Sequence, residues 1–227
     1  VGGAMPVFNY SDDKSSSNAP LSSVLFSRIQ KDILTGDIRP GEKLTEQRIC
    51  DRYKVSRTPV REALRQLEKE SLIENIPNRG AFVIGFTNQD IIDMFELRST
   101  YEVQAVRWAV ERITDDEMEA LEETFEFMEF YTMKKDIEKM LNININFHQN
   151  IYKASHNRML VNTLSSYQLY VKYTNNFDYD DPEEYLETVL EEHRKIFEAI
   201  KNRDEEAAAA AMKEHMDSSR IRRISKF

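Results

Sequence analysis

Three histidines in the C-terminal half of the chain have the side-chain chemistry and the spacing to hold one metal ion. His148, His193 and His215 lie in three separate stretches with helical periodicity. Imidazole suits Zn²⁺, Ni²⁺ and Cu²⁺, so three such rings at one point would form an open metal site. The fourth histidine, His156, lies in Ala-Ser-His-Asn, which is typical of a helix end.

The spacing of two of these histidines about a short turn predicts that they lie at one level. The turn at 202–204 is too short for anything but an antiparallel hairpin of two helices. His193 lies about nine residues before it and His215 about twelve after it, which brings them level to within roughly one helical turn at ~1.5 Å rise per residue. Asn144 lies four residues before His148, so both side chains project from one face of a third helix. The alternative for each histidine is a surface position or a hydrogen-bonded place in the core.

The elements that carry these residues are predicted to be long helices. From Asn88 onward the chain has no glycine, and its only proline is Pro182. Pro182 follows Asp180-Asp181, which indicates a helix start with proline in the first position. The periodicity predicts six helices, over 88–112, 114–134, 136–154, 158–176, 182–201 and 203–222. We expect an all-α antiparallel bundle of about six helices.

A different pattern precedes the bundle and predicts a winged helix-turn-helix, which makes the whole chain mainly α. The pattern indicates helices over 21–36 and 45–53, a third helix capped by Ser56, and strands over 72–74 and 81–84. A helix, a tight turn and a second helix at this spacing are typical of helix-turn-helix proteins. A hairpin directly after the last helix would be the wing.

The third helix of this segment carries arginines with the geometry for reading DNA. Arg57, Arg61 and Arg65 recur at every fourth position opposite an apolar face, with Thr58 at the exposed N-terminal end. Arginine forks can reach guanine O6 and N7 when the N-terminus of such a helix enters the major groove. The alternative is an ordinary solvated helix face.

The predicted hairpin tip offers a second contact with nucleic acid. Its residues Asn78, Arg79 and Gly80 can approach the sugar-phosphate backbone or the minor groove, with glycine allowing close contact.

Charge and composition support this division into 21–85 and 86–227. The net charge is −9, but residues 21–85 hold 12 Lys/Arg and 9 Asp/Glu, whereas 86–227 hold 18 and 29. A mildly basic head on an acidic body suits DNA contact through one small module. Residues 1–20 are rich in Ser, Gly and Asn and are expected to be a flexible arm or a cloning remnant. No apolar stretch approaches a membrane span, and the single Cys50 fits a reducing cytoplasm.

The N-terminal segment resembles the DNA-binding domain of the GntR family of bacterial transcriptional regulators. The resemblance is carried by three runs, Pro40-Gly41-Glu42-Lys43-Leu44, Val55 to Leu64, and Asn78 to Val83. It implies that Arg57, Thr58 and Arg61 contact DNA, with the wing tip beside them. The position of Gln47 matches an arginine in the fatty-acid-responsive prototype of this family. The resemblance therefore implies that a phosphate or base contact is lost here or is made by Arg48 instead.

The C-terminal segment resembles the FCD ligand-binding domain of one large GntR subfamily. The matching runs are Asn144 to His148, Glu192 to Ile196, and Lys213 to Met216. Members often hold a divalent metal, commonly zinc or nickel, through an Asp or Asn and three His. Asn144 stands where Asp is usual and brings no charge, which predicts weaker metal retention and a stronger pull on an anionic effector.

The resemblance also implies groups that bind a small carboxylate effector. Arg98 matches an arginine often found near the pocket, and its alternative is a salt bridge to Glu96 or Glu102. Tyr101 and Asn175 are further candidate polar groups of the pocket.

The expected function is DNA binding controlled by a small molecule. We expect a homodimeric transcriptional regulator, a repressor, that binds an inverted repeat and is controlled by a small organic acid at or near the metal. Three alternatives remain open. The metal itself is the signal, the metal is structural and the effector binds elsewhere, or an open His₃ site hydrolyses esters or amides. The last leaves the DNA-binding head unexplained, so we expect no enzyme.

Overall fold

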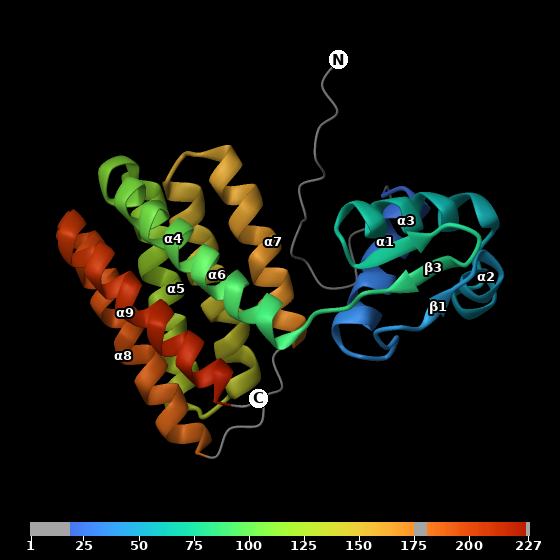
Figure 1. The fold of residues 1–227 in the computed structure, drawn as a ribbon. Coiled ribbons are helices and arrows are strands. Elements are labelled where there is room, and N and C mark those ends of the chain that lie inside the picture. The colour runs from blue at the N-terminus through green and yellow to red at the C-terminus, as the bar shows by residue number, and fades with distance from the viewer. Residues whose placement is uncertain (1–18, 175–180, 226–227) are drawn as a thin grey trace. The chain divides into compact units, whose positions relative to one another are not determined.

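The computed structural model describes residues 19–174 and 181–225, which form two compact units (Figure 1). The first unit ends at Asp90 and the second begins at Ile91. The fold is mainly α, with a small sheet in the first unit, as the sequence predicted. None of the described helices combines the length and apolar character that a membrane span requires.

The first unit is a three-helix domain with a small antiparallel sheet. Its elements are α1 (Leu21–Leu34), β1 (Lys43–Leu44), α2 (Glu46–Tyr53), α3 (Arg57–Lys69), β2 (Ile73–Ile76) and β3 (Gly80–Val83). The strand order is β1-β3-β2, with Lys43 opposite Phe82. The sequence analysis found the hairpin but missed β1, because a two-residue strand is too short to show alternation.

Local signals define the turn between α2 and α3. The Thr45 side chain accepts from the backbone N–H of Arg48 and caps α2. Lys54 adopts the left-handed conformation (φ 56°) and ends this helix. Ser56 then occupies the N-cap position of α3, with extended backbone. Val60, Ala63 and Leu67 are fully buried, so the opposite side of α3 faces solvent.

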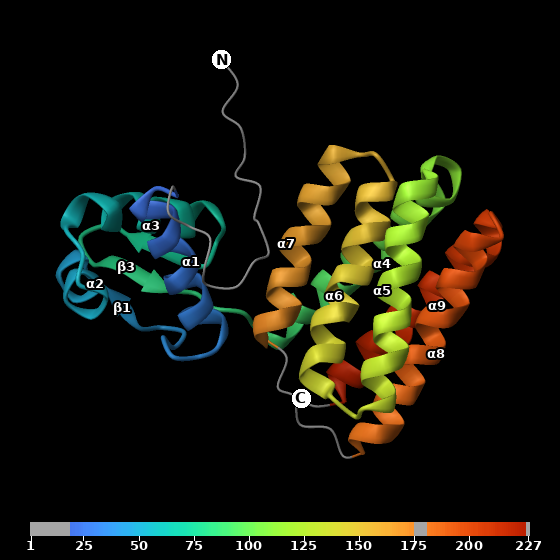
Figure 2. The same cartoon turned by 180° about the vertical axis from the view of Figure 1, so that it is seen from behind.

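The second unit is the expected helical bundle. Its helices are α4 (Asn88–Arg112), α5 (Asp115–Met133), α6 (Ile137–Ala154), α7 (Arg158–Thr174), α8 (Pro182–Lys201) and α9 (Glu205–Ile224). α5 packs against α6 and α8, α6 also packs against α7, and α8 packs against α9. Figure 2 shows α5, α6 and α7 side by side, and in Figure 1 α4 runs obliquely across the other helices.

The hairpin between α8 and α9 is closely defined and is tied to α4. The Asp204 carboxylate accepts from the backbone N–H of Ala207 and caps α9. Arg203, in the left-handed conformation (φ 56°), donates to the carbonyls of Val110 at 2.9 Å and Ile113 at 3.0 Å. These contacts hold the two histidine-bearing helices in register with the end of α4.

Candidate metal centre and nucleic-acid interface

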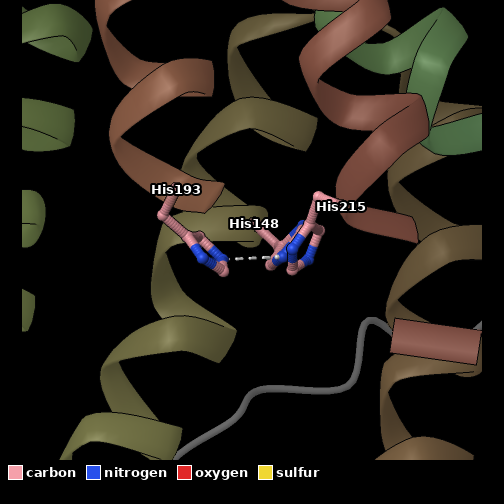
Figure 3. Close-up of side chains that lie close together, drawn as sticks. All are labelled: His148, His193 and His215. Atoms are coloured by element: carbon pink, nitrogen blue, oxygen red, sulfur yellow. Dashed lines mark hydrogen bonds between the residues drawn. The ribbon is translucent and has the colours of Figure 1, made fainter. Parts of the chain in front are cut away.

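His148, His193 and His215 converge from α6, α8 and α9 in the interior of the bundle (Figure 3). All three side chains are buried, and one ligand nitrogen from each lies within 4.8 Å of the others. The Nε2 atoms of His148 and His193 are 3.3 Å apart. The level spacing that the hairpin predicted for His193 and His215 is therefore observed, with ring centroids 4.4 Å apart.

The fourth histidine lies outside this cluster. His156 follows the end of α6 in the left-handed conformation (φ 49°) and is exposed. Its Nε2 lies 3.0 Å from Glu117. This agrees with the helix end predicted there.

Each ring in the cluster uses its Nδ1 for a hydrogen bond within the protein, which leaves Nε2 toward the centre. The acceptors are the Glu102 carboxylate for His148 (3.1 Å), the Val189 carbonyl for His193 (2.6 Å) and the Glu192 carboxylate for His215 (2.8 Å). Carbonyls and carboxylates only accept, so each Nδ1 carries a proton, and in the neutral form of each ring Nε2 keeps its lone pair for a metal. Such hydrogen bonds orient metal-binding histidines.

The protonation states of these rings suit a cation. Burial, together with the neighbouring histidines, lowers the pKa of His193 well below its usual range. Burial also lowers the pKa of His215, to about 4, although the hydrogen bond to Glu192 opposes this. The Nε2 atoms of His148 and His193 are 3.3 Å apart, so two lone pairs there would repel each other unless a proton or a metal ion lay between them. Tetrahedral ligands at ~2.1 Å from a metal are about 3.4 Å apart, which is close to this spacing.

Asn144 supplies a separate sign that the cluster fits a metal. It lies on α6, one turn before His148. Its Oδ1 is buried and has no hydrogen-bond partner among the described residues. A buried, unpaired amide oxygen is costly, and ligation of a metal would satisfy it. With Asn144 as a fourth ligand, the donor set would carry no negative charge.

Glu102 on α4 connects the cluster to a buried polar network. Its carboxylate is fully buried and pairs with Arg98 (Nη2 at 2.8 Å), with His148 and with the Tyr152 hydroxyl. Burial raises the pKa of Glu102, but its interactions with His148 and Arg98 and the hydrogen bond from Tyr152 outweigh this and bring the pKa to about 2. The salt bridge that the sequence left as the alternative for Arg98 is therefore present.

Glu192 on α8 plays the same part for His215. It accepts from the Arg222 guanidinium at 2.7 and 2.8 Å and from His215. Burial raises the pKa of Glu192, but the hydrogen bonds from Arg222 and His215 outweigh this effect, and the resulting pKa is about 2. From the sequence, Glu102 was expected only as a possible ion-pair partner of Arg98, and Glu192 only as part of a family motif. Two features of the sequence could have indicated these roles: Glu102 lies four residues after Arg98, and Glu192 directly precedes His193.

Of the candidate effector groups that the structure describes, Tyr101 lies apart from the cluster and Arg98 lies beside it. Tyr101 is 39% exposed and stacks on Tyr167 with ring centroids 6.2 Å apart. Among the described contacts it has none with the three histidines. Asn175 lies outside the described residues. Arg98 lies beside the cluster: it pairs with Glu102, and besides burial, its charge is among the causes that lower the pKa of His215.

The expected DNA-contacting residues of the first unit are exposed. They are Gln47 and Arg48 on α2, Ser56, Arg57, Thr58 and Arg61 at the start of α3, and Asn78, Arg79 and Gly80 at the hairpin tip. Asn78 (φ 61°) and Gly80 (φ 96°) form the tight turn between β2 and β3. A Cβ at Gly80 would lie 3.1 Å from Lys43 Cε, so glycine suits both the backbone and the close packing there.

Side chains of α2 contact two of the α3 arginines. Arg61 Nε donates to Glu46 Oε1 at 2.7 Å, and Arg57 Nη2 donates to Gln47 Oε1 at 3.3 Å. Arg48 pairs instead with Glu42, away from these two. Gln47 thus has a defined place beside Arg57, and Glu46 is a residue that the sequence analysis missed.

Comparison with known families agrees with both units. Residues 21–83 match the model described as bacterial regulatory proteins, gntR family, and residues 93–218 match the FCD domain. The chain belongs to the GntR family of DNA-binding transcriptional regulators, in the group with a C-terminal FCD domain.

Relatives from several bacteria cover most of the chain. It is 29% identical over 208 residues to the HTH-type transcriptional regulator YdhC of Bacillus subtilis, covering 91% of this chain and 92% of the relative. It is 28% identical to the transcriptional repressor RspR of Escherichia coli, with 90% of each chain covered. These relatives are regulators, which places the chain among regulators rather than enzymes.

Solved structures share the fold. Escherichia coli McbR/YncC matches with a TM-score of 0.71 at 23% identity, over 92% of this chain and 98% of that one. At this identity the match speaks for the fold alone.

Proposed function

We propose that this regulator is a repressor whose operator affinity is controlled by a small organic acid bound at or near a divalent metal. Asn144, His148, His193 and His215 would hold the metal, zinc or nickel by donor type. The observation that carries the proposal is the set of three Nε2 lone pairs turned toward one point by fixed Nδ1 hydrogen bonds. The unpaired Oδ1 of Asn144 supports it.

The donor set favours an anionic effector. Three neutral imidazoles and one amide leave the full charge of a divalent ion uncompensated by its ligands. A bound metal would supply Lewis acidity and open coordination positions to a carboxylate. Two relatives point the same way: the galactonate operon repressor of Escherichia coli (26% identical, covering 80% of this chain) and the gluconate operon repressor of Bacillus licheniformis (25%, covering 82%). Their names involve sugar acids, so a hydroxylated carboxylate is the first class to test.

On the DNA side, we propose that α3 enters the major groove of each half of an inverted repeat bound by a homodimer. Arg57, Thr58 and Arg61 would contact bases or phosphates there, with Gln47, Arg48 and Ser56 beside them. Asn78, Arg79 and Gly80 would contact the backbone from the wing. Effector binding would change the free energy of operator binding by a coupling free energy of roughly 1–3 kcal/mol.

The test combines metal analysis with ligand binding. We expect purified protein to contain about one divalent ion per chain and to show a thermal shift with sugar acids. Both should be lost in His148→Ala and kept in His156→Ala, which removes an exposed histidine outside the cluster. An effector that binds the His148→Ala protein unchanged would contradict the proposal. Electrophoretic mobility shift with the upstream region of its own gene, with and without the acid, gives the direction of control.

A second candidate is that the metal itself is the signal. It is favoured by Asn144, because a neutral fourth ligand holds a metal less tightly than a carboxylate would. Operator affinity that changes with Zn²⁺ or Ni²⁺ alone, and not further with any carboxylate, would support this candidate over the first.

A further inference from the structure

We propose that Glu46 is a specificity-determining residue that acts by position. From α2 it holds the Arg61 guanidinium so that the two terminal nitrogens of Arg61 read one base of the operator. This goes beyond the DNA contact expected of Arg61, because it assigns the discrimination at that base to a carboxylate that does not read DNA itself.

The geometry leaves the reading end of Arg61 free. Glu46 Oε1 accepts from Arg61 Nε at 2.7 Å. Both Nη atoms of Arg61 remain without an acceptor among the described residues. These two nitrogens form the fork that pairs with O6 and N7 of guanine. A guanidinium fixed at Nε meets DNA with much of its side-chain entropy already lost, which favours an oriented contact.

The other arginines of α3 are held differently. Arg57 donates from a terminal nitrogen, Nη2, to the neutral Gln47 at 3.3 Å. Arg65 donates from Nη1 to Glu62 at 3.1 Å, three residues away on the same helix. Of these three arginines, only Arg61 has its Nε held from another helix with its fork open.

Stability alone does not explain a carboxylate in this place. Arg61 is exposed and Glu46 is partly exposed, and ion pairs at the surface contribute little to the free energy of unfolding. A negative charge beside the N-terminus of a recognition helix also repels phosphate. The hydrogen bond from Arg61 lowers the pKa of Glu46, so this charge persists. Glu46 also lies in the first turn of α2, where a carboxylate favours the helix dipole, and the experiment must separate that role.

The experiment selects binding sites for the full chain from a randomised double-stranded DNA pool. Affinity is then measured for the selected site, for every single-base variant of it and for an unrelated duplex, at one salt concentration. The variants are Glu46→Ala, Glu46→Gln, Glu46→Asp and Arg61→Ala. Glu62→Ala is the matched control, because it also removes a carboxylate paired with an α3 arginine.

We expect Glu46→Ala to lower the ratio of specific to non-specific affinity by ~10-fold. Its discrimination should be lost at the same base pair of each half-site as in Arg61→Ala. Glu46→Gln keeps an acceptor oxygen at the same reach and should retain most of the ratio. Glu62→Ala should strengthen binding to all duplexes alike and leave the ratio within about twofold.

Three results would overturn the proposal. The first is a ratio in Glu46→Ala no lower than in Glu62→Ala. The second is discrimination lost at a different base from Arg61→Ala. The third is a loss of ratio that follows a loss of thermal stability and is fully restored by Glu46→Asp. Aspartate keeps the charge at the start of α2 but shortens the reach to Arg61, so that result would assign Glu46 to the helix end.

Discussion

At the scale of single residues, the candidate centre depends on the groups that orient its histidines. Glu102 fixes the proton of His148 on Nδ1, and Glu192 does so for His215. Each carboxylate is itself held by an arginine, Arg98 or Arg222. Removing one of these carboxylates would leave the ligand in place but free its ring and tautomer.

We predict that Glu102→Gln lowers affinity for Zn²⁺ by roughly 10- to 100-fold, because the ring of His148 is then oriented by a weaker, neutral acceptor. Competition with a chromophoric chelator measures the change. Glu117→Gln is the control, since Glu117 pairs with His156 outside the cluster. Equal affinities for Glu102→Gln and wild type would show that the carboxylate does not orient the ligand.

Acid should destabilise the metal-free protein, and buried side chains give the pH range. The pKa of His215 is about 4 in the folded chain against an ordinary 6.5, so the unfolded chain binds more protons between these values. The free energy of unfolding should therefore fall as pH drops from about 6.5 to 4. The pKa values of Glu102 and Glu192 are about 2 against 4.5, so stability falls further below pH 4.5. Urea unfolding of chelator-treated protein across this pH range measures the free energy of unfolding. A free energy of unfolding that stays constant from pH 7 to 4 would contradict the prediction.

At the scale of elements, helix starts determine where the ligands lie. Asp204 caps α9, and the hairpin before it sets His215 level with His193. Thr114 caps α5 through a reciprocal capping box with Glu117, and α5 carries none of the proposed ligands. Loss of either cap should cost stability, but only one of them should move a ligand.

We predict that Asp204→Ala lowers the free energy of unfolding by about 1 kcal/mol and also weakens Zn²⁺ binding. Thr114→Ala should cost a similar amount without affecting Zn²⁺. Denaturant unfolding and metal titration of both variants separate the effects. An unchanged Zn²⁺ affinity in Asp204→Ala would mean that the register of α9 is set by other contacts, such as those of Arg203.

At the scale of the whole molecule, the bundle holds three buried imidazoles in its interior, and an Asn144 oxygen with no hydrogen-bond partner among the described residues. That arrangement is costly without a cation, so metal binding and folding of the second unit should be linked. The linkage would also give the proposed effector a way to act, because a change in the packing of α6, α8 and α9 would alter the second unit, which is joined in sequence to the DNA-binding unit.

We predict that Zn²⁺ at about 100 times its Kd raises the free energy of unfolding by about 2.7 kcal/mol. The gain should vanish in His193→Ala and persist in His156→Ala. Thermal denaturation before and after chelation measures it. If wild type and His193→Ala gain equally, the metal binds somewhere other than the cluster.

The sequence alone determined what depends on local patterns. Six helices were predicted close to their observed bounds, because apolar periodicity, caps and Pro182 act within a few residues of each helix end. The short hairpin at 202–204 also determined the level of His193 relative to His215. Only the tertiary structure decided which nitrogens face the centre, that Arg98 pairs with Glu102, and that Tyr101 stacks on Tyr167. Those outcomes depend on how helices far apart in sequence rotate against one another, and periodicity fixes which face of a helix is apolar but not which partner that face meets.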